Sequence, residues 1–493
     1  MKLMFSSLLF VCSITILAQT DKELVQNTVS KSAIEGHIYF LADDLLKGRE
    51  TGTAENKIAA SYLANTMRGY GVQPASKEGT FYQNIPMQRV SPPKHTDLTL
   101  DGVSVRHKVA IEAVPLEYTG NVVFVGYGLE ADYTGKNVAN QVVVMKAGGP
   151  DATDARSAFG YRDKKMALAK KAGAAGVIEL LSTDENLWGF IDHNFTNSRI
   201  SLATNEAKEA PKSNGLPYIW VWDETGSYSK IFSEKNTVKS TLKMEAAVTE
   251  TITTQNVVGM VEGTDPMLKD EYIIYSGHYD HVGIGTPDET GDTIYNGARD
   301  NAVGITTVLS MAQNLAKYPT KRSALFILFT GEEKGLLGSE YYVENPVLPL
   351  EQMVYCFNSD NAGYNDTSLA TIIGLNRTSA GSHIKEAATA FGLTAVDDPA
   401  PEQGLFDRSD NVKFAAKGIP APTFSLGFTA FDGTLTQYYH RPGDEAESLD
   451  YDYLLKFFSA YVLSGRKIAN DPVTPFWTAG DKYEEAGKKL YKK

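Results

Sequence analysis

The spacing of apolar residues changes along the chain, and each change marks a different kind of element. In residues 31–72, apolar side chains recur every three or four positions, as at Ile34 and Ile38, which predicts helix. After a proline-rich break, residues 96–124 alternate in the manner of short strands. We therefore predict that residues 19–95 form a helical N-terminal part.

The middle of the chain carries an α/β pattern of its own. Residues 141–145 and 176–180 are apolar strands, with a helix predicted over 164–172 between them. This stretch holds no cluster of His, Asp and Glu at ligand spacing, and its lone His193 is typical of a structural or solvated histidine. We predict that residues 96–250 form an inserted, β-rich, non-catalytic domain.

From residue 251 onward, strands alternate with helices. Residues 324–329 are an almost continuous apolar run, which is typical of a strand covered on both faces. Apolar stripes predict helices over 302–316 and 453–467. Further strands are predicted over 272–275, 353–357 and 422–426. Together these elements predict a three-layer α/β/α unit with a mixed, mainly parallel sheet over residues 251–493.

Acidic and imidazole side chains stand where the predicted strands end or in later loops. In open α/β sheets, ligands bind beyond the carboxyl ends of the strands. Two imidazoles and several carboxylates are the ligands that a pair of divalent metal ions requires, and one carboxylate is left over as a base. The set is His278, Asp280, Asp300, Glu332, Glu333, Asp360 and His440.

The positions of several of these residues suggest particular roles, and Asp300 has two possible roles. Asp280 follows His278 by two positions and could orient its imidazole. Glu332 and Glu333 are neighbours whose side chains point in different directions at a strand end, so one can bind metal while the other faces water. Asp300 could bridge two metal ions or cap the helix that follows, and the two roles compete for the same oxygens.

Five segments resemble the motifs of the co-catalytic zinc exopeptidases, in that family's order. They are Gly277-His278-Tyr279-Asp280-His281, Gly297-Ala298-Arg299-Asp300-Asn301-Ala302, Gly331-Glu332-Glu333, Asn358-Ser359-Asp360 and Tyr439-His440-Arg441-Pro442. The family includes bacterial zinc aminopeptidases, glutamate carboxypeptidase, the glutaminyl cyclases and the transferrin receptor. The middle of the chain, at residues 135–144 and 171–178, resembles a protease-associated domain.

The resemblance implies a role for each candidate residue. It implies two Zn²⁺ per chain, one held by His278 and Asp360, the other by Glu333 and His440, with Asp300 between them, Glu332 as general base and Asp280 orienting His278. It further implies an aminopeptidase that removes N-terminal residues from peptide substrates. The family often has Ser-Asp-His near the substrate pocket, whereas this chain has Ser409-Asp410-Asn411, so no role is assigned there. His281 is also left without a role.

Three alternatives belong to the same family. A carboxypeptidase acting on acidic peptides would need basic residues around the substrate carboxylate, which Arg299, Arg408 and Arg441 could supply. A glutaminyl cyclase uses one zinc, and the complete five-ligand set argues against it. A non-catalytic binding protein like the transferrin receptor is disfavoured because every ligand and the base are present.

Composition and the N-terminal segment limit the possible binding partners and the location of the protein. The 493 residues carry a formal net charge of −13, which disfavours nucleic acid and anionic membranes as partners. Residues 1–18 have the charge and apolar run of a secretory signal peptide, so an exported, periplasmic or extracellular protein without a further membrane span is predicted. Only Cys12 and Cys356 are present, so no disulfide forms after cleavage. The oligomeric state stays open.

Overall fold

The chain divides into two compact units in the computed structural model, which describes residues 19–203, 215–235 and 237–492. One unit ends at Ile85 and resumes at Thr254, and the other is Pro86–Thr253. The inserted unit brackets the domain predicted over 96–250, whose identity as a protease-associated domain stays a prediction. The predicted signal peptide, residues 1–18, lies outside the described residues.

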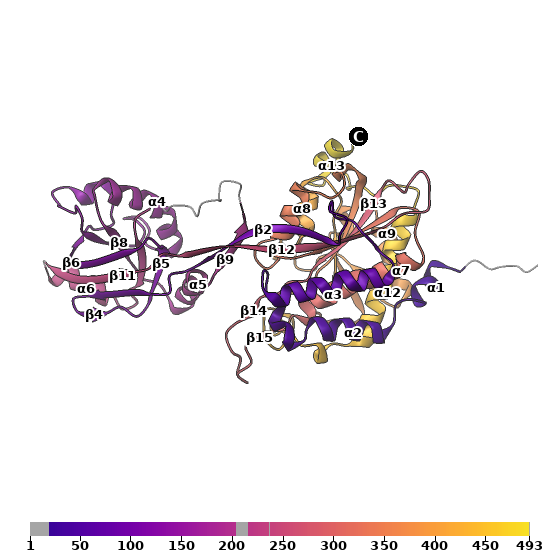
Figure 1. The fold of residues 1–493 in the computed structure, drawn as a ribbon, viewed down its shortest axis with the longest axis horizontal. Coiled ribbons are helices and arrows are strands. Elements are labelled where there is room, and N and C mark those ends of the chain that lie inside the picture. The colour runs from indigo at the N-terminus through magenta and orange to yellow at the C-terminus, as the bar shows by residue number, and fades with distance from the viewer. Residues whose placement is uncertain (1–18, 204–214, 236, 493) are drawn as a thin grey trace, which may run out of the picture. The chain divides into compact units, whose positions relative to one another are not determined.

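The larger unit is built on a mixed sheet (Figure 1). Its strands are β1 (Gln73–Pro74), β2 (Tyr82–Ser91), β12 (Val248–Val261), β13 (Tyr272–His278), β16 (Ser323–Phe329), β17 (Met353–Ser359), β18 (Leu369–Ile373), β19 (Thr394–Val396) and β20 (Thr423–Leu426). Strand β9 (Arg199–Leu202) falls in the inserted unit, where it pairs with Met87–Val90 of β2. The strand order in this unit is β19-β18-β20-β17-β13-β16-β12-β2, and β1 pairs with β12. Strands β16, β13 and β17 are parallel neighbours, so they end at the same edge.

Helices cover both faces of this sheet. The helices of the larger unit are α1 (Asp21–Gln26), α2 (Lys31–Leu41), α3 (Ala54–Tyr70), α7 (Gly304–Lys317), α8 (Leu337–Glu344), α9 (Gly381–Ala390), α10 (Asn411–Ala416), α11 (Gly433–Thr436), α12 (Tyr451–Asn470) and α13 (Glu484–Tyr491). Successive strand residues enter different cores: Ile273 belongs to the core that also contains residues of α2, α3, α7 and α12, and Ile274 to the core that contains residues of α8 and α10. The predicted three-layer α/β/α architecture is confirmed, and it explains why the central strands are apolar on both faces.

Short helical turns and a hairpin complete the larger unit. The turns of the chain are η1 (Asp44–Arg49), η2 (Glu130–Tyr133), η3 (Ala298–Val303), η4 (Leu350–Gln352), η5 (Leu375–Arg377), η6 (Pro401–Gln403), η7 (Leu405–Asp407) and η8 (Ala446–Ser448), of which η2 belongs to the inserted unit. The hairpin joins β14 (Gly283–Ile284) to β15 (Ile294–Tyr295).

The helical prediction for residues 31–72 needs one correction. Helix α2 ends at Leu41, and α3 begins only after Thr53, whose hydroxyl caps it. Between them, Lys47 and Gly48 have left-handed φ angles of 44° and 65°. Apolar periodicity does not register this interruption, because both flanking helices bury their stripes in the same core.

The inserted unit has a sheet and cores of its own. Its sheet has the order β4-β3-β11-β6-β7-β8-β10-β5. These strands are β3 (Thr96–Leu100), β4 (Val103–Ser104), β5 (Lys108–Glu112), β6 (Leu116–Phe124), β7 (Val142–Lys146), β8 (Gly176–Leu181), β10 (Tyr218–Trp222) and β11 (Val238–Met244), and the helices are α4 (Ala155–Lys171), α5 (Glu185–Thr196) and α6 (Ser227–Glu234). A fully buried ion pair joins Lys165 to Glu179, which also accepts hydrogen bonds of 2.6 Å from Tyr218 and Trp220. Every charge of this pair is therefore matched inside the unit.

No helix in the described part of the chain has both the length and the apolar character needed to span a bilayer.

One histidine in the helical layer makes stability depend on pH. The His37 ring lies between Tyr62 and Tyr70, at 2.7 and 2.8 Å from their hydroxyls, and burial lowers its pKa to about 4 from 6.5. Between pH 4 and 6.5 the unfolded chain binds more protons than the folded one, so stability is full above pH 6.5 and falls as the pH drops toward 4. We expect a loss of about 1 kcal/mol per pH unit in that window.

The measurement is denaturant unfolding of metal-free protein at pH 7.5 and 5.0, for the wild type and His37→Gln. The wild type should lose more stability on acidification than the variant, because only the wild type carries this ring. Equal losses in the two proteins would contradict the assignment.

Candidate metal centre and active site

The parallel pairing of three strands brings distant residues to one edge. His278 is the last residue of β13 and pairs with Phe329 at the end of β16. Glu332 and Glu333 follow β16 after a two-residue turn, and Asp360 directly follows β17. These side chains therefore meet at the carboxyl ends of the strands, as the sequence predicted.

The structure distinguishes between the two possible roles of Asp300, a metal ligand and a helix cap. Asp300 lies in η3 with φ −110° and ψ 90°, and the first N–H of α7, that of Gly304, donates to Oδ1 of Asn301 at 3.1 Å and not to Asp300. Its main-chain N–H donates to the carboxylate of Asp444 at 3.2 Å, and Arg299 N–H does the same at 3.0 Å. The carboxylate of Asp300 is thus free of capping and available to the site.

Asp300 stands between two imidazoles. Its Oδ1 lies 3.2 Å from Nε2 of His278, and its Oδ2 lies 3.2 Å from Nε2 of His440. His278 Nε2 is also 3.3 Å from Asp360 Oδ1, and His440 Nε2 is 3.1 Å from Glu333 Oε2. The five residues with predicted metal roles therefore form one chain of contacts centred on Asp300.

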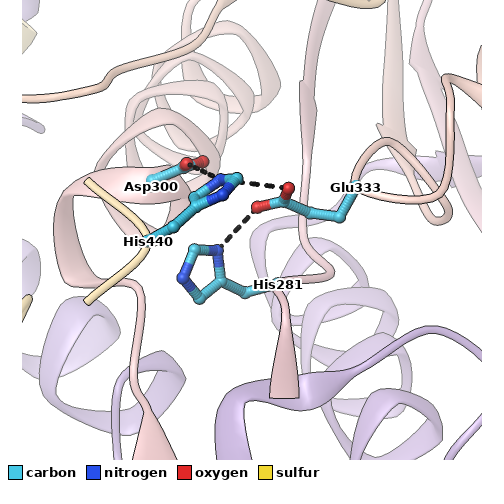
Figure 2. Close-up of side chains that lie close together, drawn as sticks. All are labelled: His281, Asp300, Glu333 and His440. Carbon is cyan, nitrogen blue, oxygen red and sulfur yellow. Dashed lines mark ion pairs between the residues drawn. The ribbon is translucent and has the colours of Figure 1, made fainter. Parts of the chain in front are cut away.

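His281 is a member of this cluster that the sequence did not single out. Figure 2 shows its ring beside Glu333 and next to His440, with Nδ1 2.8 Å from Glu333 Oε1 and the two ring centroids 5.4 Å apart. The ring is fully buried. One signal could have found it: His281 follows the same buried strand as His278 and lies only three residues farther along the chain.

The donor atoms fit metal ions. Nε2 of His440, Oε1 of Glu333 and both ring nitrogens of His281 are buried, and none makes a hydrogen bond of normal geometry among the described residues, although His281 Nδ1 lies 2.8 Å from Glu333 Oε1 and His440 Nε2 lies 3.1 Å from Glu333 Oε2. Two groups have ligand atoms within 4.8 Å of one another, one formed by His281, Asp300, Glu333 and His440 and the other by His278, Glu332 and Asp360. Buried nitrogen and oxygen atoms that converge without hydrogen bonds are what a cation would satisfy, and imidazole with carboxylate suits zinc.

The orientation of His278 supports the same reading. Its Nδ1 lies 3.1 Å from the main-chain oxygen of Asp280, and this oxygen can only accept. Nδ1 therefore carries the proton, and in the neutral ring Nε2 turns a lone pair toward Asp300 and Asp360. Lone pairs facing carboxylates repel one another unless a positive charge lies between them.

The pKa shifts of the site residues show that the site requires positive charge. Burial opposes a charge on His440, but its contacts with Asp300 and Glu333 prevail and raise its pKa to about 10. Burial raises the pKa of Glu332 well above its usual value, and Asp360 and Glu333 add to that rise. The site thus holds excess negative charge that either protons or metal ions must balance.

Asp280 reaches its neighbours in a way the sequence did not show. Its carboxylate lies 3.9 Å from the His278 ring, which instead hydrogen-bonds the Asp280 main-chain oxygen. The carboxylate accepts the main-chain N–H groups of Glu332 and Glu333 at 3.2 and 3.3 Å. Asp280 therefore holds the glutamate pair with its side chain and the imidazole with its backbone.

A pocket opens beside these residues. His278, Asp300, Glu332 and Asp360 form one side of it. The rest of the lining is Asn361, Ala362, Ile373, Leu405, Arg408, Ser409, Thr423, Ser425, Phe428, Phe431 and Tyr439. A wall that combines apolar side chains with hydroxyl, amide and guanidinium groups next to a charged centre is compatible with a small substrate site.

Comparisons with known proteins agree with this arrangement. Residues 256–463 match the sequence model of "Peptidase family M28", and all seven candidate residues lie within that match. Aminopeptidase YwaD of Bacillus subtilis is 25% identical over 414 residues, covering 82% of this chain and 78% of its own. The probable leucine aminopeptidase 2 of Aspergillus oryzae is 26% identical over 365 residues, covering 69% and 65%.

Solved structures share the fold. An aminopeptidase from Aneurinibacillus sp. strain AM-1 superposes with a TM-score of 0.58 at 20% identity, covering 92% of this chain and 97% of its own. A zinc aminopeptidase of Bacillus subtilis superposes with a TM-score of 0.52 at 19% identity, covering 90% and 97%. Residues 256–463, which carry the motifs and the donor cluster, are thus similar to peptidase family M28, in agreement with the resemblance to the co-catalytic zinc exopeptidases.

Proposed function

We propose that this protein is an aminopeptidase with two zinc ions, in which Glu332 acts as general base. The observation that carries the proposal is the placement of Asp300, whose two carboxylate oxygens each face a different imidazole at 3.2 Å. His278 and Asp360 would hold one ion, Glu333 and His440 the other, and Asp300 would contact both. His281, 2.8 Å from Glu333, supplies a further donor on that second side.

Zinc ions held by these ligands would polarise the carbonyl of the scissile peptide bond and lower the pKa of a water molecule. Glu332 faces the pocket, its side chain is 11% exposed, and its Oε2 lies 4.0 Å from His278 Nε2. From there Glu332 takes a proton from the attacking water and passes it to the departing amine. The Asp280 carboxylate keeps Glu332 in place by accepting a hydrogen bond from the main-chain N–H of Glu332.

The pocket favours a free N-terminus over a free C-terminus. Asp360 and Glu332 line it, and carboxylates attract the α-ammonium group of a peptide. Of the three arginines that could have bound a substrate carboxylate, only Arg408 lines the pocket. Arg299 is buried and occupied by Asp444 at 3.0 Å. The relatives named above are aminopeptidases, in agreement with this choice.

A substrate panel tests the reaction and its direction. We expect zinc-loaded protein to cleave chromogenic leucine and alanine derivatives that have a free α-amine, because apolar side chains such as Phe428 and Ile373 line the pocket. N-acetylated versions should not react. Cleavage of N-blocked peptides with a C-terminal glutamate would show a carboxypeptidase instead.

Glu332→Gln should keep its zinc and lose activity. The amide preserves the shape of the side chain but cannot take a proton, so kcat should fall by about 10²–10⁴-fold. Glu351→Gln, at an exposed glutamate of η4, is the matched control and should leave kcat unchanged. The measurement is steady-state kinetics with zinc content by mass spectrometry, and wild-type turnover in Glu332→Gln would remove this residue from the mechanism.

Zinc should stabilise the folded chain. Chelator-treated protein should bind two ions per chain, and zinc at 100 times its Kd should add about 2.7 kcal/mol per site to the free energy of unfolding. His440→Ala should lose one ion and its share of this gain. His193→Ala, at an exposed histidine of the inserted unit, should behave as the wild type. A wild type that binds no zinc would instead favour a non-catalytic binding protein.

A further inference from the structure

Arg49 is a buried arginine with an unusual set of partners. It lies at the end of η1, is fully buried, and makes hydrogen bonds that go to main-chain oxygens. The acceptors are Tyr279 (2.7 Å), Leu41 (2.7 Å), Gly297 (2.7 Å), Asp300 (3.5 Å) and Asn296. Three of them belong to the segments that carry the metal-site residues, 278–281 and 297–300.

The charge of Arg49 has no direct counterion among the described residues. Buried arginines are usually paired with carboxylates, and an unpaired buried charge is costly. Here the carboxylates that act on it belong to the metal site and its surroundings. Burial lowers the pKa of Arg49 to about 10, whereas Asp300, Asp280, Asp444 and Glu333 raise it. Arg49 therefore lies within the field of the site without occupying any of its ligand atoms.

The local backbone is shaped to deliver this side chain. Arg49 has φ 40° and follows Gly48 at φ 65°. A Cβ at Gly48 would fall 2.6 Å from the carbonyl oxygen of Gly283 and would also collide with that of Tyr295, so no larger residue fits. Asn56 then secures the turn, because its Nδ2 donates to the Arg49 main-chain oxygen at 3.0 Å.

Thr51 makes a second link from the same turn to the site. It is fully buried, and its hydroxyl donates to Oδ2 of Asp280 at 2.8 Å. The same carboxylate accepts the main-chain N–H groups of Glu332 and Glu333. Arg49 and Thr51 thus reach different parts of the site, one through backbone oxygens and the other through Asp280.

We propose that Arg49 is a positioning residue, which fixes the segment carrying His278 and His281 relative to the segment carrying Asp300 and so sets the spacing of the two metal positions. Thr51 supports it by holding Asp280. The inference rests on the proposed zinc centre but not on the substrate. The five main-chain acceptors around Arg49 require the planar fork of a guanidinium, which the single ammonium of lysine cannot reproduce.

Two other roles for Arg49 predict different changes in zinc affinity. If it acted only through its charge, Arg49→Met would bind zinc more tightly than the wild type, since a cation near the ligands would be gone. Arg49→Lys would then resemble the wild type. If it only stabilised the fold, both variants would unfold more easily in the absence of metal but bind zinc with normal affinity. A positioning role weakens zinc binding in both variants.

The experiment titrates the full-length, chelator-treated proteins with zinc against a fluorescent chelator, alongside metal-free thermal unfolding and steady-state kinetics. We expect Arg49→Lys to lower zinc affinity and kcat by about 10–100-fold, as is usual when a group that orients metal ligands is changed. KM should change little. Arg322→Lys, at a fully buried arginine bound to Glu271 at 2.7 Å, is the matched control and should keep wild-type zinc affinity.

Wild-type zinc affinity in Arg49→Lys, or tighter binding in Arg49→Met, would overturn the proposal. If the Arg49 variants do not fold, a comparison of Thr51→Val with Thr51→Ser tests the proposal instead. Valine keeps the shape of threonine but lacks the hydroxyl, whereas serine keeps the hydroxyl. Lower kcat in Thr51→Val with recovery in Thr51→Ser supports the proposal, and wild-type values in both overturn it. A wild type that binds zinc but cleaves no peptide would refute the proposed function alone, since the affinity comparison still stands.

Discussion

Repulsion between buried carboxylates is the constraint on which the rest of this structure depends. Asp280, Asp300, Glu332, Glu333 and Asp360 converge at one edge of the sheet, and each side chain is at most 18% exposed. Like charges cannot share such a region without positive charge between them. The imidazoles that lie between them provide it when protonated, and metal ions provide it when the imidazoles are neutral. Folding and metal binding are therefore coupled through the same few side chains.

The fold meets this constraint by assembling rigid pieces. Parallel strands place His278, Glu332 and Asp360 together because their ends coincide. Asp300 arrives from the turn before α7, held by hydrogen bonds from the backbone to Asp444. His440 comes from a late loop. Since each group is fixed by a different part of the larger unit, no single element could supply the site.

The N-terminal part of the chain is a structural component of the site although it carries none of its predicted ligands. Helix α2 ends early, and the left-handed turn that follows sends Arg49 and Thr51 toward the segments after β13 and β15. This turn also explains a glycine, Gly48, in an otherwise helical region. The inserted unit, in contrast, has its own cores and provides none of the candidate residues.

The sequence by itself determined the layered fold, because periods of two and 3.6 are local and survive in any context. It also located the main donors, because polar residues directly after apolar strands must lie at the edge of a sheet. Only the tertiary structure showed that Asp300 is not a helix cap, that the Asp280 backbone contacts the His278 ring, that His281 lies in the donor cluster, and that Arg49 hydrogen-bonds the segments that carry these residues. Each of these findings rests on contacts between residues as many as 251 positions apart, and such contacts leave no periodic pattern in the sequence.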